Sequence, residues 1–247
     1  MISFFDCDAA FGPALVPPMR YAPTAEALLA EMDFCGLSRA LVYHAAMRDD
    51  APEVGNELLL AGIHGQPRLA GTWVLAPPQT GEFPGPDRLA AELKRHDIRA
   101  LRAFPERHRY LLNGVTFGPI FEVMIAAHVP LILAADWQLI AELLRDFPRL
   151  TVIALQQSNH GQDRYFRPLL EAYANLVIAT SRYECDGAIP ELCARYGAQR
   201  LVFGTGYPDV PMGGAALALL HCGLPEEDVA AIAGGNLERL LQEVDLG

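Results

Sequence analysis

Acidic and imidazole side chains stand at the ends of several apolar runs in this 247-residue sequence. Asp6 and Asp8 are separated by one residue after the first run, His44 ends the second, and Asp136 follows the fifth. Carboxylate and imidazole groups in such places can exchange protons with a substrate or with an attacking water. We therefore take Asp8, His44 and Asp136 as the candidate catalytic residues.

Each of these groups also has a purely structural interpretation. Asp6 or Asp8 would then cap a backbone segment or form an ion pair with Arg102. His44 would fill an apolar position through hydrogen bonds. Asn236, near the end of the chain, is expected to cap the last helix through its side-chain oxygen. The sequence alone leaves the catalytic and the structural interpretations of the acids and of His44 open.

Arginine, aromatic and amide side chains at other run ends are suited to holding a substrate. A guanidinium binds a carboxylate through two parallel hydrogen bonds, and an aromatic ring stacks on a planar ligand. The candidate substrate-binding residues are Arg102, Trp137, Gln156, Arg182, Tyr183 and Tyr207. The alternatives are ion pairs with acidic neighbours and ordinary ring packing. His160, within SNHGQ, is expected to be a solvated loop residue.

Composition and charge exclude several classes of protein. The 19 basic and 30 acidic residues give a net charge of −11, which repels a phosphate backbone, so we expect no nucleic-acid partner. No apolar run approaches the ~20 residues of a membrane span, and no secretion signal is recognised. We expect a cytoplasmic protein with no membrane partner and with reduced cysteines. The single lysine, Lys94, lies on the polar side of an amphipathic pattern, which argues against imine chemistry.

The elements that must position these residues alternate along the chain. The expected strands are residues 2–6, 39–44, 69–76, 98–104, 130–134, 151–155, 176–181 and 200–204. The expected helices are residues 24–35, 52–63, 87–96, 117–128, 138–147, 165–174, 188–196, 214–222, 226–233 and 237–243. Apolar strands separated by helices indicate a parallel sheet covered by helices. Eight such units in this length predict the α/β class and a single-domain (β/α)₈ TIM barrel over residues 1–247.

A doubly wound open sheet is the competing fold. It usually carries a glycine-rich phosphate-binding turn after its first strand, whereas only Gly12 is found there. The barrel is therefore the preferred prediction, and it places the active site at the carboxyl ends of the strands.

Several segments resemble the amidohydrolase-related family, the metal-dependent TIM-barrel hydrolases and decarboxylases. The similar segments are, in chain order, FFDCDAAFG, VPLILA, LTVIALQ, YANLVIATS, RLVFGTGYP and AGGNLERLL. The FGTGYP after the last strand and the GGN that opens the final helix are the most specific. The resemblance covers nearly the whole chain and implies the same barrel.

The positions that bind metal in that family carry other residues here. The resemblance places the H-x-H of the family on Asp8 and Ala10, its strand-5 and strand-6 histidines on Ala134 and Gln156, and its strand-8 aspartate on Gly206. Alanine and glycine offer no side-chain ligand, and only Asp8 retains a group suited to a divalent ion. We therefore expect no metal ligands and no cofactor, Zn²⁺ included.

The resemblance and the replaced ligands together predict an amidohydrolase-like protein that hydrolyses a small anionic or cyclic substrate without the family's metal centre. Two alternatives stay open. One is a catalytically inactive relative that binds a small anionic ligand or regulates a partner; the other is a relocated metal site built from Asp6, Asp8, His44 and Asp136. The expected partner is a small anionic molecule, and the sequence does not decide between a monomer and a homo-oligomer.

Overall fold

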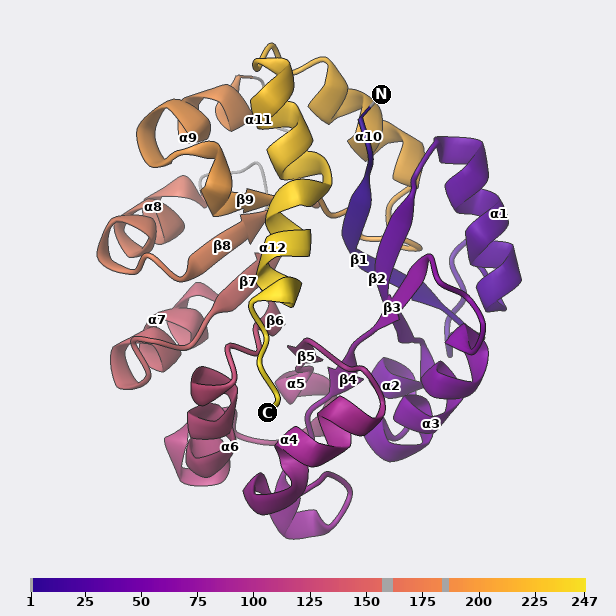
Figure 1. The fold of residues 1–247 in the computed structure, drawn as a ribbon, viewed down its shortest axis with the longest axis vertical. Helices are drawn as coiled ribbons and strands as arrows, with labels where there is room; N and C mark the ends of the chain where they lie inside the picture. The colour runs from indigo at the N-terminus through magenta and orange to yellow at the C-terminus, as the bar shows by residue number, and fades with distance from the viewer. Residues whose placement is uncertain (1, 157–161, 184–186) are drawn as a thin grey trace.

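The computed structural model describes residues 2–156, 162–183 and 187–247 (Figure 1). Its strands pair in parallel and in chain order within a three-stranded sheet and a six-stranded sheet. They are β1 (Phe5–Phe11), β2 (Arg39–His44), β3 (Leu69–Gly71), β4 (Trp73–Val74), β5 (Leu101–Arg102), β6 (Leu131–Ala134), β7 (Val152–Leu155), β8 (Leu176–Ala179) and β9 (Leu201–Val202). Only Thr72 separates β3 from β4, so these two short strands together make one stave of the barrel. The described residues therefore form a barrel of eight staves.

The sheet closes between its first and last strands. The Cys7 amide donates a hydrogen bond to the Phe203 carbonyl at 2.9 Å, and the Ala10 amide donates to the Tyr207 carbonyl at 3.0 Å. Ala9 and Tyr207 also form a parallel bridge. Closure leaves the sheet without an exposed edge and confirms the predicted (β/α)₈ barrel.

Helices surround the barrel, as Figure 1 shows. The longer ones are α1 (Ala25–Cys35), α3 (Pro52–Ile63), α4 (Pro86–Arg95), α6 (Gly114–Ala126), α7 (Trp137–Asp146), α8 (Asp163–Ala172), α9 (Ala188–Tyr196) and α10 (Met212–Leu220). The shorter ones are α2 (Ala46–Asp49), η1 (Pro78–Thr80), α5 (Pro105–His108), η2 (Ala198–Arg200), α11 (Glu226–Ala230), the π-helical η3 (Ala231–Gly235) and α12 (Asn236–Gln242). The predicted helices are confirmed within a few residues, whereas α2 and α5 were not predicted.

The first strand differs from the prediction of residues 2–6. The observed β1 runs from Phe5 to Phe11, and its later residues pair with β2 beyond a register shift that follows Asp6. The small and acidic residues of this strand have low strand propensity. Its backbone nevertheless forms hydrogen bonds with neighbouring chain segments on both sides. Asp6 and Asp8 therefore lie inside the barrel wall and not beyond its end.

The amino ends of the strands are closed by the C-terminal helix α12. Leu237 and Leu241 of this helix pack with Phe5, Ile132 and Val202 in an apolar cluster inside the barrel. Figure 1 shows α12 lying across the barrel in this view. The apolar plug leaves the opposite, carboxyl ends of the strands for polar side chains.

Asn236 has a different role from the predicted helix cap. Its amide nitrogen donates hydrogen bonds to the backbone carbonyls of Ala198 and Leu201, both at 2.8 Å, and its side chain makes no cap hydrogen bond. The helix continues without a break from η3 into α12, so its first amides have helical partners and need no cap. Asn236 instead joins α12 to the chain entering β9.

Two expectations from composition concern membranes and thiols. None of the helices in the described part of the chain is long and apolar enough to cross a membrane. Cys7, Cys35, Cys193 and Cys222 are free thiols, in agreement with the expected reduced state, and Cys185 lies outside the described residues.

We predict that Asn236→Ala lowers stability, because two carbonyl oxygens at the base of the barrel lose their side-chain donor. The expected loss is about 2 kcal/mol, or roughly 5 °C in the melting temperature. Thermal unfolding followed by circular dichroism measures it. Gln242→Ala, on the exposed side of the same helix, is the control and should change little. Equal melting temperatures of Asn236→Ala and wild type would contradict the assignment.

Candidate active site at the carboxyl ends of the strands

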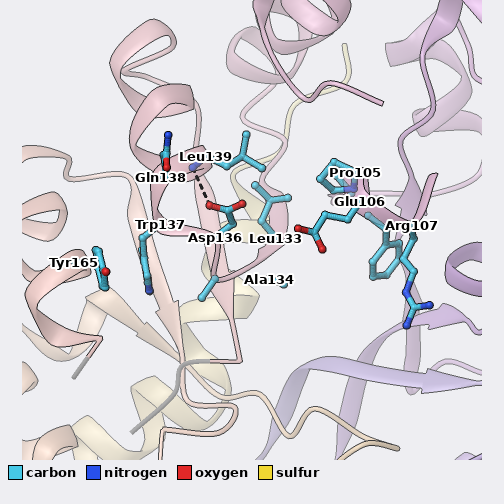
Figure 2. Close-up of a pocket in the computed structure, with 13 residues that line it drawn as sticks. Pro105, Glu106, Arg107, Leu133, Ala134, Asp136, Trp137, Gln138, Leu139 and Tyr165 are labelled. Carbon is cyan, nitrogen blue, oxygen red and sulfur yellow. Dashed lines mark hydrogen bonds between the residues drawn. The ribbon is translucent and has the colours of Figure 1, made fainter. Parts of the chain in front are cut away.

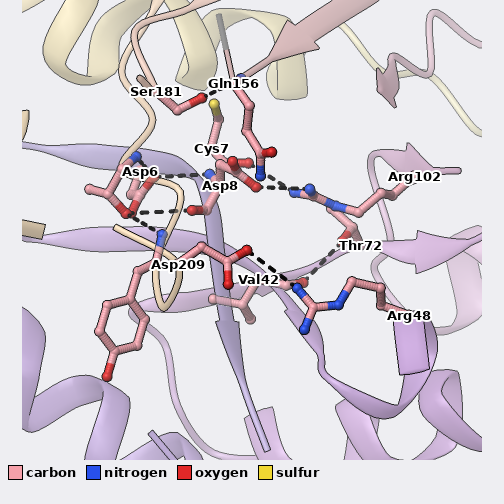
Figure 3. Close-up of polar contacts among 12 residues, drawn as sticks. Asp6, Cys7, Asp8, Val42, Arg48, Thr72, Arg102, Gln156, Ser181 and Asp209 are labelled. Atoms are coloured by element: carbon pink, nitrogen blue, oxygen red, sulfur yellow. Dashed lines mark hydrogen bonds and ion pairs between the residues drawn. The ribbon is translucent and has the colours of Figure 1, made fainter. Parts of the chain in front are cut away.

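Asp6 is completely buried on β1 and holds the segment that follows β9. Its Oδ1 accepts hydrogen bonds from the amides of Asp8 and Thr205, each at 2.9 Å, and its Oδ2 accepts one from Thr205 Oγ1 at 2.6 Å (Figure 3). Burial raises the pKa of Asp6 to about 6, while the hydrogen bonds from Thr205 and Asp8 lower it. These contacts show the backbone-binding role considered for this pair of acids.

Asp8 forms a buried ion pair with Arg102 of β5. Arg102 Nη1 donates to Asp8 Oδ1 at 2.9 Å, and Nη2 donates to the Cys7 carbonyl at 3.2 Å (Figure 3). Both side chains are only 3% exposed. Burial raises the pKa of Asp8, and the adjacent Arg102 charge opposes that rise. The ion-pair alternative is therefore what the structure shows for Asp8 and Arg102.

Other polar side chains surround this pair. The backbone amide of Gln156, at the end of β7, donates a hydrogen bond to Ser181 Oγ at 2.8 Å, and the Gln156 side chain lies beside Asp8 (Figure 3). Arg48 of α2 reaches Asp209 at 3.4 Å, and the Asp209 charge contributes to the raised pKa of Asp8. The barrel axis thus carries a connected polar cluster, which we call the axial cluster: Asp6, Asp8, Arg102, Gln156 and Thr205.

His44 is held by its own neighbours at the end of β2. Its Nδ1 accepts a hydrogen bond from the Ala46 amide at 3.2 Å, and its ring packs edge-on against Phe11 at 5.3 Å. A Cβ on Gly12 would lie 2.3 Å from His44 Nε2, so only glycine fits beside the ring. Burial lowers the pKa of His44, which favours the neutral ring. These contacts correspond to its structural interpretation.

A cavity of about 620 Å³ opens at the carboxyl ends of β5 and β6 (Figure 2). It is lined by residues 103–107, residues 133–139 and Tyr165. Among the candidate residues, Asp136 and Trp137 border it, whereas Asp8, His44 and Arg102 do not. The available space therefore lies beside the barrel axis and not directly over the Asp8–Arg102 pair.

Asp136 and Trp137 are positioned by the start of α7. Asp136 is the N-cap of this helix, and its Oδ1 accepts a hydrogen bond from the Leu139 amide at 3.0 Å (Figure 2). The Trp137 indole donates to the Gln162 side chain, and its ring packs against Phe166 with ring centres 5.3 Å apart. These contacts fix a carboxylate and an indole side by side on one wall of the cavity.

The remaining substrate-binding candidates lie outside the lining of this cavity. Arg182 is exposed, with a φ of 58°. The buried Tyr183 donates its hydroxyl to Asp163 at 3.0 Å. Tyr207 is also buried, and its amide donates to Thr205 Oγ1 at 3.1 Å. Both tyrosines thus have structural contacts in the barrel.

Sequence reasoning missed the opposite wall of the cavity. This wall is formed by Phe104, which follows β5, by Glu106 and Arg107 of α5, and by Tyr165 of α8. Glu106 extends toward the cavity in Figure 2. Phe104 ends the predicted fourth strand and PERH follows it directly, so this position at a strand end was the available signal.

The donors around Asp8 do not suit a divalent metal ion. Asp8 is paired with a guanidinium, whose charge would repel a second cation at the same carboxylate. Within residues 2–156, 162–183 and 187–247, no three His, Cys, Asp or Glu side chains are grouped so that they could hold a metal ion. The relocated site proposed from Asp6, Asp8, His44 and Asp136 is therefore not formed by those residues. His160 lies outside the described residues.

We predict that Asp6→Asn changes how stability depends on pH. The pKa of Asp6 is about 6 in the folded protein against 3.8 for an unperturbed group, so stability should fall as pH rises from about 4 to 6. Two pH units correspond to about 3 kcal/mol, and Asn removes that loss. Urea unfolding at a series of pH values measures it. Asp50→Asn, at an exposed carboxylate, is the control. Parallel profiles for Asp6→Asn and wild type would contradict the prediction.

Comparison with known proteins reveals similar folds at low sequence identity. A 5-carboxyvanillate decarboxylase from Sphingomonas paucimobilis is 16% identical, with a TM-score of 0.72 over 99% of this chain and 100% of that chain. A dihydroxybenzoic acid decarboxylase from Polaromonas sp. JS666, with bound manganese and the inhibitor 2-nitroresorcinol, is 16% identical, with a TM-score of 0.71 over 98% of this chain and 97% of that chain. That protein binds manganese, so our expectation that this chain has no cofactor stays a prediction.

A third similar structure is a probable 2-pyrone-4,6-dicarboxylic acid hydrolase from Acinetobacter baumannii with citric acid bound. It is 15% identical, with a TM-score of 0.73 over 98% of this chain and 100% of that chain. A search of the curated proteins finds no match. Residues 6–242 match the family model described as Amidohydrolase. Because that match spans nearly the whole barrel, the chain belongs to the amidohydrolase family.

Proposed function

We propose that this chain is a hydrolase that acts on a small cyclic ester in the cavity at the ends of β5 and β6, with Asp136 as general base and without a metal ion. The observation that carries the proposal is the position of Asp136 on the cavity wall. Asp8 and His44, the other two candidate bases, are buried and bonded to their neighbours. Asp136 is therefore the best-placed proton acceptor among them.

Only one carboxylate oxygen of Asp136 is needed to hold its side chain in place. Oδ1 caps α7, and no hydrogen bond from the described residues reaches Oδ2. In the proposed reaction Oδ2 takes a proton from water as the water oxygen attacks the ester carbonyl carbon. The ring C–O bond then breaks, and the proton passes from Asp136 to the departing alkoxide oxygen. The product is an open-chain hydroxy acid.

The cavity walls favour a ring without a net negative charge. Glu106 and Asp136 both line the cavity, and Arg107 is the one cationic side chain among its lining residues. Arg102 is already paired, and Arg182 lies outside the lining, so neither predicted arginine is available there for an anion. Trp137 and Phe104 offer apolar surface to a ring. Of the small anionic or cyclic substrates expected from the sequence, a neutral cyclic ester thus suits the walls better than an anion.

A binding protein without turnover is the second candidate. It is favoured by one observation: the axial carboxylates already bond to partners within the chain, which removes them as bases. The probable 2-pyrone-4,6-dicarboxylic acid hydrolase supports the enzymatic candidate in one respect, because a 2-pyrone is a cyclic ester; the two carboxyl groups of that compound distinguish it from the neutral ester proposed here. Ligand binding and turnover must therefore be measured on the same compounds.

We predict that Asp136→Asn lowers hydrolysis by at least ~100-fold, because it removes the proton acceptor, while stability changes little. Asparagine is an equally good N-cap, so α7 keeps its start. The assay follows a panel of small lactones by pH-stat in the presence of EDTA, and thermal shift reports binding. Glu142→Gln makes the same chemical change at an exposed position on the same helix and should retain full activity.

Three results would decide against this function. Turnover by Asp136→Asn at the wild-type rate would remove Asp136 as the base. Loss of turnover in EDTA, restored by a divalent ion, would contradict the metal-independent reaction. Thermal stabilisation by a lactone that wild type does not hydrolyse would favour the binding protein.

A further inference from the structure

We propose that the guanidinium of Arg102 is the resident cation of the barrel axis, and that it supplies to Asp8 the positive charge that a bound metal ion would otherwise supply. This inference concerns the axial cluster and does not depend on the proposed hydrolysis in the cavity beside it. It follows from the backbone position of Arg102, from the partners of its guanidinium, and from the charges buried around it.

The position of Arg102 is set by strand pairing on both sides. It pairs with Val74 of β4 and with Ile132 of β6, and both pairings are parallel. Successive side chains on a strand point to opposite faces of the sheet. Leu101 accordingly packs in the outer apolar layer, while Ala100 packs in the cluster inside the barrel. Arg102 therefore shares the interior face with Ala100, and its side chain has no route to solvent through the wall.

The guanidinium is held from three directions. Nη1 donates to Asp8 Oδ1, Nη2 donates to the Cys7 carbonyl, and Cζ lies 4.5 Å from the centre of the Tyr43 ring. A carboxylate and a carbonyl are ligands that hard cations also use, and an aromatic face attracts a cation. The chain thus surrounds this position with a carboxylate, a carbonyl and an aromatic face, and the Arg102 guanidinium occupies it, although Nε has no hydrogen-bond partner among the described residues.

The buried charges make that cation necessary. Asp6 accepts hydrogen bonds from a hydroxyl and from backbone amides, so none of its described hydrogen-bond partners is a cation. Asp8 lies two residues away on the same strand and pairs with Arg102 at 2.9 Å. Without Arg102, Asp8 would be a buried carboxylate with no cation at this position, which is strongly unfavourable. A small free cation should therefore enter the space left by truncating Arg102.

The experiment compares wild type, Arg102→Ala and the double variant Asp8→Asn/Arg102→Ala by thermal unfolding. Arg102→Ala should melt about 10 °C below wild type, because it leaves Asp8 buried and unpaired. Millimolar guanidinium should recover part of that loss, whereas urea, which has a similar shape and no charge, should recover none. The double variant has no carboxylate at position 8 and should not respond to guanidinium. Wild type should not respond to either compound.

Direct metal binding gives an independent measurement. Mn²⁺ titration followed by electron paramagnetic resonance should find no ion bound at Asp8 in wild type. One bound equivalent in wild type that Asp8→Asn abolishes would overturn the proposal, because a metal would then be the resident cation. Equal stability of Arg102→Ala and wild type would also overturn it, as would equal recovery of Arg102→Ala by urea and guanidinium.

Two longer substitutions keep the proposal testable if Arg102→Ala does not fold. Arg102→Lys retains the charge, and Arg102→Gln retains hydrogen-bond donors without it. The lysine variant should melt several degrees above the glutamine variant, because only lysine neutralises Asp8. Equal melting temperatures of these two variants would mean that hydrogen bonding, and not charge, is what Asp8 requires, and would overturn the proposal.

Discussion

The barrel interior depends on burying two carboxylates of one strand, Asp6 and Asp8, of which Asp8 pairs with a buried guanidinium. A buried carboxylate is tolerated only when hydrogen bonds or an opposite charge replace its lost hydration. Asp6 accepts hydrogen bonds from Thr205 and from the Asp8 backbone amide, and Asp8 pairs with Arg102 through Oδ1. The two acids therefore need different partners from distant parts of the chain. Both carboxylates have those partners in the closed barrel.

The Asp6 contacts belong to the closure of the barrel itself. β1 and the segment after β9 are the first and last parts of the sheet, and they meet through the Cys7–Phe203 and Ala10–Tyr207 backbone bonds. Thr205 lies between those two bonds and adds its amide and hydroxyl to Asp6. Asp6 is thus part of the junction that makes the sheet continuous. Its raised pKa is the electrostatic consequence of placing that junction in the interior.

The axial ion pair also explains why open space lies off the axis. Arg102, Asp8 and Gln156 occupy the centre of the carboxyl end, so the cavity forms instead between the ends of β5 and β6. The short helix α5 and the start of α7 form its walls and bring Glu106 and Asp136 to it. Membership of the amidohydrolase family establishes the barrel, whereas these local contacts decide which side chains border the cavity.

The sequence by itself determined the barrel, because alternating apolar runs and amphipathic helices are local patterns that each segment expresses alone. It also indicated that polar side chains would gather at strand ends. Only the tertiary structure decided which groups pair: Arg102 lies 94 residues from Asp8, and Thr205 lies 199 residues from Asp6. Contacts over such separations depend on strand register and barrel closure. For the same reason only the structure placed Glu106 and Asp136 on the same cavity, held Asp8 within β1, and assigned Asn236 to the base of the barrel.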